Sequence, residues 1–148
     1  MLFRSQIAPP EEIYQRPAST FVARFIGTPP MNILTLQDKA GAAVIEGMDG
    51  PVILPEPGED LSLGVRPEDI EISDESGVPA KVANLEYLGA DTIVDCVVGG
   101  QSLSVRAHRR ISVQPGSIIR LAWPTDSVHI FRSSTGERRG DFTVRELA

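Results

Sequence analysis

The sequence has few of the features that cross-link a chain or anchor it in a membrane. Cys96 is its only cysteine, so these 148 residues can form no internal disulfide, which agrees with a reducing compartment. No apolar run approaches the length needed to cross a bilayer. The first five residues lack the long apolar region of a secretory signal. We therefore expect a cytoplasmic location.

Short motifs that carry out catalysis are also absent. The sequence has no Gly-x-x-x-x-Gly-Lys-[Ser/Thr] phosphate loop, no His-Glu-x-x-His, no Cys-x-x-Cys and no Gly-x-Ser-x-Gly elbow. Scattered acids are numerous enough for acid–base work, but nothing in their spacing indicates that two of them converge. We therefore expect that this chain is not an enzyme and holds no cofactor or metal of its own.

Positive charge and aromatic rings are scarce. The net charge is −6 and aromatic residues make up 5% of the chain, whereas nucleic-acid binding draws on cationic surface and on rings that stack with bases. The densest basic cluster is Arg106, His108, Arg109 and Arg110, which we interpret as a solvated face. We expect no nucleic-acid partner, and keep an OB-type nucleic-acid binder only as the least favoured hypothesis.

What the sequence does contain is enough apolar material for one ordinary domain, since 41% of its residues are hydrophobic. Pro9 and Pro10 followed by Glu11 and Glu12 predict the start of a short helix. A second helix should open at Pro17, with one apolar face formed by Phe21, Val22, Phe25 and Ile26.

From Asn32 onward the pattern changes to short strands separated by turns. We predict strands over residues 33–36, 43–45 and 52–54, then a polar loop over 55–60. The long strand 78–88 loses its alternation between Val82 and Leu85, which indicates a β-bulge. Residues 92–98 and 103–107 form the clearest hairpin, with Gly99-Gly100 as its turn and Cys96 facing the core. Later strands should cover 119–123 and 128–131, with His129 a packed or surface side chain. The pattern predicts a mainly β fold, a small barrel or sandwich of OB type preceded by short helices.

The stretch Leu63–Ile70 carries the strongest local signals for structure in the sequence. Leu61, Leu63 and Val65 alternate with polar or small residues, as in a strand with one buried face, and Pro67 then ends the ladder. Arg66 is followed closely by Glu68 and Asp69. Such an arginine can be a satisfied ion pair or an anion site, and we favour the ion pair.

Several stretches resemble one family of transport proteins. Gly64-Val-Arg-Pro-Glu68 is similar to a signature in the regulatory domain of sugar-importer ATPases of the ABC class. Residues 10–32, ending in Met-Asn, resemble the stretch that closes the nucleotide-binding domain of those ATPases. Glu86–Thr92 resembles the family's Leu-Gly-x-x-Thr turn, and His129–Phe131 resembles its closing His-x-Phe motif. The chain is thus similar to the C-terminal, transport-associated OB domain of subunits that import maltose, sn-glycerol 3-phosphate and other sugars.

The resemblance implies an organisation and a set of partners. Residues 1–31 would be the helical end of a nucleotide-binding domain, 32–132 the OB-type regulatory domain, and 133–148 a weakly ordered tail or interaction arm. ATP and Mg²⁺ would bind in the remainder of the parent subunit, because this sequence also lacks the family's Leu-Ser-Gly-Gly-Gln signature. The domain would form a homodimer, would reach membrane-spanning permease subunits through its parent subunit, and could meet a regulatory protein at the cytoplasmic face of the bacterial inner membrane.

Two short segments are our candidates for contacts between protomers or with a regulator. They are the exposed faces around the Arg66 corner and around the Gly89 turn, that is, Arg66, Pro67, Glu68, Asp69, Gly89, Asp91 and Thr92. An alternative function is a free-standing module that holds a small oxyanion through Arg66, Arg106 or loop amides. In the family that the chain resembles, the membrane subunits and a separate solute-binding protein select the transported solute.

Overall fold

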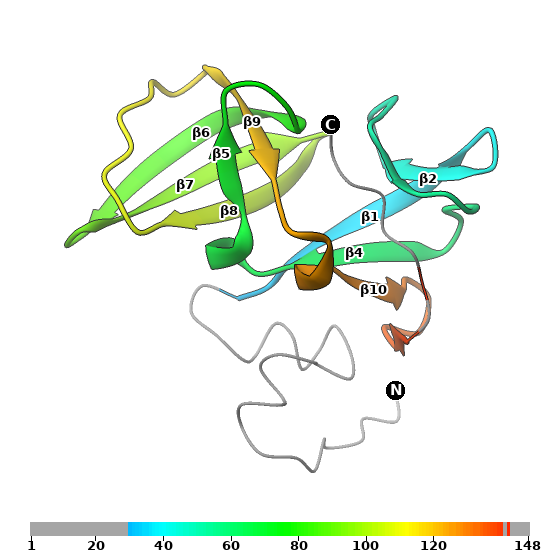
Figure 1. Ribbon diagram of the computed structural model, residues 1–148. Helices are drawn as coiled ribbons and strands as arrows, with labels where there is room; N and C mark the ends of the chain where they lie inside the picture. The colour runs from blue at the N-terminus through cyan, green and yellow to red at the C-terminus, as the bar shows by residue number, and fades with distance from the viewer. Residues whose placement is uncertain (1–29, 141, 143–148) are drawn as a thin grey trace, which may run out of the picture.

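The computed structural model describes residues 30–140 and residue 142, so the predicted helices before residue 27 lie outside the described part. The described chain is mainly β, as the sequence predicts (Figure 1). Its elements are β1 (Asn32–Lys39), β2 (Ala42–Ile45), β3 (Val52–Leu54), β4 (Leu61–Val65), the 3-10 turn η1 (Pro67–Asp69), β5 (Glu71–Ser73), β6 (Val78–Leu88), β7 (Asp91–Val98), β8 (Gln101–Ala107), β9 (Ile118–Ala122), the 3-10 turn η2 (Thr125–Ser127), β10 (His129–Arg132) and β11 (Arg138–Arg139).

The strands form two curled antiparallel sheets of OB type (Figure 1). One sheet has the order β11-β10-β4-β1-β2-β3 and the other has the order β5-β9-β6-β7-β8. Apolar side chains from both sheets belong to one buried cluster, which includes Leu34, Ile53, Leu63, Val94 and Leu121. Burial of this shared cluster is what holds the two sheets together.

The β7–β8 hairpin confirms the prediction made from its alternation. Cys96 pairs with Leu103 across the hairpin, and Gly99 and Gly100 turn the chain with φ of 56° and 81°. Cys96 is 2% exposed, and burial raises the pKa of its thiol to about 11, so the thiol stays protonated at neutral pH. The expected bulge in β6 is also present, because the register with β7 shifts between Val82 and Asn84.

Strand β4 differs from its prediction because both of its faces are buried. It lies between β1 and β10 in the sheet, and Ser62, expected on an exposed face, is 4% exposed. Gly64 explains how the second face is covered. A Cβ at this position would lie 2.6 Å from Cε2 of Phe131 and 2.8 Å from Sδ of Met31. The missing side chain therefore makes room for those two residues to pack over the strand.

The segment after Arg132 adds one short strand to the first sheet. Arg138 and Arg139 form β11, in which Arg139 pairs with Ile130. The Ser133 amide donates to the carbonyl of Asp60 at 2.9 Å, and the amide and hydroxyl of Ser134 donate to the Asp60 carboxylate at 2.8 and 2.7 Å. Residues 138–139 thus join the sheet in a segment whose sequence has no apolar period, because backbone pairing does not require one.

Two matching corners carry the chain between the sheets. η1 leads from β4 in the first sheet to β5 in the second, and η2 leads from β9 in the second sheet back to β10 in the first. The residues before the turns have φ/ψ of −71°/143° (Arg66) and −64°/142° (Pro124), and those after have −91°/132° (Ile70) and −93°/138° (Val128). The two corners therefore have the same backbone shape.

The strands around the two corners are also related to each other. In the β4–β10 pair, Gly64 lies opposite His129, and in the β5–β9 pair, Ala122 lies opposite Glu71. A shift of 58 positions converts each pair into the other, so residues 63–72 correspond to residues 121–130. The centre of the domain thus has an approximate two-fold relation that the amino-acid identities conceal.

Side-chain amides join the two sheets where β1 passes β8. Nδ2 of Asn32 donates to the carbonyl of Ser104 and the Ser104 amide donates to Oδ1 of Asn32, both at 2.8 Å. In the opposite sense, Oε1 of Gln101 accepts from the Thr35 amide at 2.8 Å and its Nε2 donates to the Thr35 carbonyl at 3.1 Å. Each side-chain amide takes the place of a peptide group in a strand ladder.

Candidate functional site

The predicted contact face at the Arg66 corner is only partly exposed. Arg66 is 2% exposed and Pro67 is also buried, whereas Asp69 is half-buried and Glu68 is exposed. The prediction of an exposed face is therefore wrong for Arg66 and Pro67. Arg66 follows a strand that is covered on both sides, so its side chain begins inside the domain. Glu68 alone of these four can serve as a fully exposed contact residue.

The Gly89 turn divides in the same way. Gly89 is exposed at the tip between β6 and β7, Asp91 is half-buried, and Thr92 is 0% exposed. The hydroxyl of Thr92 donates to the carbonyl of Arg109 at 2.9 Å and accepts from the amide of Ile111 at 3.1 Å. Thr92 therefore fastens the loop that follows β8 and is a structural residue in this fold.

Asp91 organises a charged group at the end of the β7–β8 hairpin. Its Oδ2 accepts from Nε and Nη2 of Arg106 at 3.0 and 2.9 Å, and its Oδ1 lies 3.2 Å from Nδ1 of His108. The hydrogen bonds from Arg106, and then those from His108, lower the pKa of the Asp91 carboxyl. The hairpin register could have revealed this pair, because Thr92 lies opposite Ala107 and so places Asp91 diagonally across from Arg106.

Three of the four residues of the basic cluster are solvated, as interpreted from the sequence, whereas Arg106 is half-buried and paired with Asp91. His108, Arg109 and Arg110 are exposed, and the Arg110 guanidinium lies 4.3 Å from the centre of the Tyr87 ring. Tyr87 also donates its hydroxyl to the carbonyl of Ile111 at 3.0 Å. These contacts hold the loop after β8 against the β6–β7 tip.

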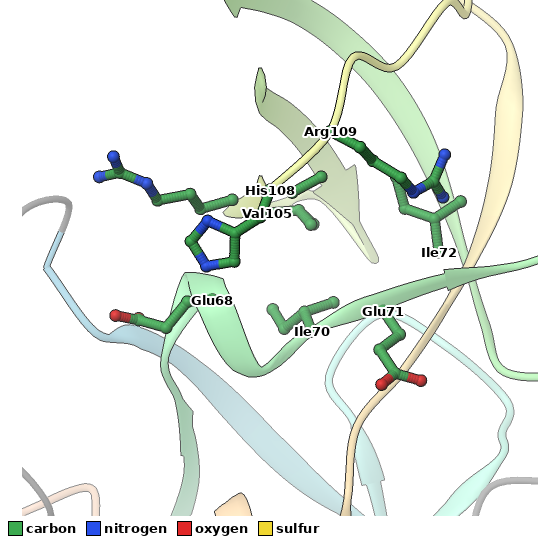
Figure 2. A pocket seen from close by; sticks show the side chains of 9 residues that line it. Glu68, Ile70, Glu71, Ile72, Val105, His108 and Arg109 are labelled. Atoms are coloured by element: carbon green, nitrogen blue, oxygen red, sulfur yellow. The ribbon is translucent and has the colours of Figure 1, made fainter. Parts of the chain in front are cut away.

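One hollow of about 390 Å³ lies between η1 and β8, and we name it the β8 hollow. Figure 2 shows Glu68, Ile70 and Glu71 along one side and His108 and Arg109 along the other. Its lining is Glu68, Ile70, Glu71, Ile72, Val105, Arg106, Ala107, His108 and Arg109. The hollow therefore has an apolar floor with an acidic edge and a basic edge.

A second hollow, of about 830 Å³, lies on the other side of η1, and we name it the Arg66 hollow. It collects Arg66 and Asp69 from the first corner, residues 125–129 from the second corner, and Arg138 from β11, with Gly140 and Phe142. Burial, and then the charges of Glu68 and Asp126, raise the pKa of Asp69, while Arg66 opposes the rise. Cationic and acidic groups thus share this lining.

The structure separates the predicted site residues instead of gathering them. Glu68 lines the β8 hollow together with Arg106 and His108, which both hydrogen-bond to Asp91. Arg66 and Asp69 line the Arg66 hollow instead. His129 is packed, as expected: it is buried, its ring centre is 6.5 Å from that of Phe131, and its Nδ1 accepts from Nε of Arg138 at 3.4 Å. Sequence reasoning missed Arg138, because β11 has no apolar pattern to mark it.

Two kinds of feature are missing from the part of the chain that the structure describes. Within residues 30–140 and 142, no group of three or more histidine, cysteine or acidic side chains is placed to hold a metal ion. Over the same residues, no helix has the length and apolarity needed to span a membrane.

One family model matches a segment that contains both corners. The family model described as the TOBE domain matches residues 63–131, which run from β4 through both corners to the end of the Phe131 motif. These residues are similar to a TOBE domain. The match covers both halves of the two-fold correspondence and both glutamates on the acidic edge of the β8 hollow.

Over most of its length the chain is also similar to curated transport proteins. It is 41% identical over 142 residues to the sn-glycerol-3-phosphate import ATP-binding protein UgpC of Pectobacterium atrosepticum. It is 39% identical over 140 residues to UgpC of Yersinia pestis, and 39% identical over 142 residues to UgpC of Escherichia coli O157:H7. Each alignment covers 90% of this chain, but only 40%, 39% and 40% of the respective relatives. The chain thus spans about two fifths of the length of the curated relatives it matches.

Proposed function

We propose that this chain is the C-terminal regulatory and pairing part of the ATP-binding subunit of an ABC importer for sugars or sn-glycerol 3-phosphate. The observation that carries the proposal is the 39–41% identity over 90% of the chain to import ATP-binding proteins, together with the TOBE-domain match at residues 63–131. In this proposal ATP and Mg²⁺ bind elsewhere in the parent subunit, and this chain is not itself an enzyme. The parent subunit works at the cytoplasmic face of the inner membrane with its permease subunits.

The proposed mechanism assigns the domain a mechanical role. Two ATP-binding subunits close on ATP and separate after hydrolysis, and a pair of TOBE domains keeps the two subunits joined while the catalytic halves move apart. Such a link requires a domain that does not deform as the halves move. One buried cluster shared by both sheets, two crossing corners and the amide bridges between β1 and β8 supply that rigidity.

A chimera tests this proposal. The segment of Escherichia coli O157:H7 UgpC that matches this chain is replaced by this chain, and uptake of sn-glycerol 3-phosphate and subunit pairing are measured in cells. We expect the chimera to support uptake and pairing, and a UgpC truncated before the segment to lose most of its pairing. A chimera that is expressed at the normal level but neither imports nor pairs would contradict the proposal, as would normal pairing of the truncated subunit.

A second candidate function is oxyanion binding, and the composition of the Arg66 hollow favours it. Arg66, His129 and Arg138 bring cationic or protonatable side chains to one cavity, and Ser127 and Thr125 also line it. Asp69 and Asp126 line the same cavity and would repel an anion, so this function ranks second.

Thermal unfolding tests the oxyanion function. Inorganic phosphate, sulfate and sn-glycerol 3-phosphate are each added at millimolar concentration, and a bound anion would raise Tm. Arg138→Gln should abolish the rise, whereas Arg132→Gln, which changes an exposed arginine outside the lining, should preserve it. No rise with any of the three anions would end this candidate.

A further inference from the structure

The last described residues of the chain form part of the lining of the Arg66 hollow. They are Arg138, Arg139, Gly140 and Phe142, which we name the strap, and all of them except Arg139 line the hollow. Arg139 forms an ion pair with Glu56 in the loop after β3, and Phe142 packs against the main apolar cluster. The strap is therefore attached to the domain by side chains on both sides of β11.

A further attachment of the strap joins two basic side chains. Nε of Arg138 donates to Nδ1 of His129 at 3.4 Å. Because an arginine side chain has no acceptor atom, this contact requires a lone pair on the histidine nitrogen, and so a neutral ring. A protonated ring carries hydrogen on both nitrogens and offers no lone pair. Protonation of His129 would thus replace a hydrogen bond by a contact between two donors of the same charge.

The surroundings of His129 offer somewhere for the displaced charge to go. The ring is 7% exposed and lines the Arg66 hollow, and Gly64, the residue opposite it on β4, adds no charge. Among the described residues, the charged side chains that share this lining are Arg66 before η1, Asp69 in η1, Asp126 in η2 and Arg138 in β11. The two carboxylates favour a protonated ring, and the two arginines oppose it. Both carboxylates can also receive an arginine that has left the ring.

We propose that His129 is a pH-sensitive contact that holds the strap in place. The neutral ring accepts from Arg138 and keeps the strap against the Arg66 hollow. When the ring takes up a proton, in the range of about pH 5 to about pH 7 in which histidines change charge, Arg138 leaves Nδ1 and turns toward the carboxylates of the hollow. The strap then loosens and the hollow widens, while the two sheets stay folded. This switch is independent of the importer function proposed above.

Hydrogen exchange resolved by residue tests the switch. Exchange rates of the full 148-residue chain are measured by NMR at about pH 7.5 and about pH 5, and each is divided by the rate of an unstructured peptide at the same pH. We expect the protection of the Arg139 amide, in the β10–β11 pair, to fall about tenfold at the lower pH, because a hydrogen bond that holds the strap is lost. The midpoint of the fall should coincide with the titration of the His129 ring. The Leu103 amide, in the β7–β8 hairpin, should keep its protection.

Three substitutions by glutamine separate the proposed contact from its neighbours. In Arg138→Gln the new amide can donate to a neutral ring or accept from a protonated one, so the protection of the strap should no longer depend on pH. Arg139→Gln is the matched control on the same strand. It removes the contact with Glu56 and should lower the protection at both pH values, but the fall of about tenfold between them should remain. His108→Gln removes the other histidine of the chain and should also leave that fall unchanged.

Four results would overturn the switch. The first is a protection of the Arg139 amide that is the same at both pH values, or absent at both. The second is an equal fall in the Arg138→Gln variant, which would show that the arginine is not the group displaced. The third is a fall shared by the Leu103 amide, which would show that the whole domain opens. The last is a fall that disappears in His108→Gln, which would assign the titration to the other histidine.

Discussion

The two corners of the domain have one backbone and two different sets of side chains. Each leads from a strand of one sheet into a strand of the other through a single 3-10 turn, closed by a hydrogen bond of 3.0 Å from the third turn residue to the carbonyl before the turn. Leu63 corresponds to Leu121 and Ile70 to Val128, and all four are buried. The shared part is therefore the apolar frame, which anchors each corner in the core.

The charged positions differ between the corners. Arg66, buried before η1, corresponds to the exposed Pro124 before η2, and Asp69 corresponds to the half-buried Ser127. Because the second corner has the same shape without an arginine or an acid at these positions, neither charge is needed to turn the chain. The first corner thus carries charges that the backbone does not require, and they face the Arg66 hollow.

The apolar residues that the two corners share predict comparable losses of stability when Ile70 or Val128 is truncated. Ile70 and Val128 are both 3% exposed, so Ile70→Ala should lower the free energy of unfolding by about 3 kcal/mol and Val128→Ala by about 2 kcal/mol, in proportion to the side-chain carbon atoms removed. Urea unfolding measures both losses. Ile118→Ala, at a side chain that is 64% exposed, should cost under about 0.5 kcal/mol. A large loss at only one anchor would show that the corners are not equivalent supports.

Arg66 and Pro124, which differ between the corners, predict unequal losses of stability. Arg66→Ala should lower the free energy of unfolding by about 2 kcal/mol, because it empties a buried volume and removes the cation that favours the charged form of Asp69. Pro124→Ala should cost under about 1 kcal/mol, mainly by making the unfolded chain more flexible. Arg66→Met retains most of the volume and so separates packing from charge. Equal losses from Arg66→Ala and Pro124→Ala would remove the distinction between the corners.

Gly64 and Ala122 are a third pair of corresponding positions, and they test how tightly side chains pack over the strand before each corner. Gly64→Ala should cost about 1 to 2 kcal/mol, because the new Cβ would overlap the Phe131 ring and Met31. Ala122→Gly should cost about 0.5 to 1 kcal/mol through backbone entropy alone. Phe131→Leu combined with Gly64→Ala should cost less than the sum of the two single changes. Strict additivity in that double-mutant cycle would mean that the ring does not set the requirement for glycine.

Local sequence pattern predicted the elements whose own residues determine them. The β7–β8 hairpin, its Gly99-Gly100 turn and the bulge in β6 each leave a signal in neighbouring residues, and the structure confirms them. The same pattern could not predict that Arg66 is buried, since the cover over β4 comes from Met31 and Phe131, which are distant in the sequence. The hollows depend on the sheet register, and β11 depends on backbone pairing, so neither leaves a local period.

The smallest and most specific difference between the corners is the titration of Asp69. Its pKa is raised in the folded state, so the folded chain holds this proton more tightly than the unfolded chain does, and stability falls as the pH rises from the ordinary aspartate pKa through the raised one. Asp69→Asn should therefore stabilise the fold at pH 7 relative to its effect at pH 3. Asp91→Asn should do the opposite, because the lowered pKa of Asp91 favours the fold above the ordinary pKa and loses that effect as the pH falls through the lowered value.

Asp126→Asn should bring the Asp69 pKa down, measured from its carboxyl carbon by NMR, because one of the charges that raise it is removed. An unchanged Asp69 titration in that variant would mean that the two corners do not interact electrostatically across the Arg66 hollow.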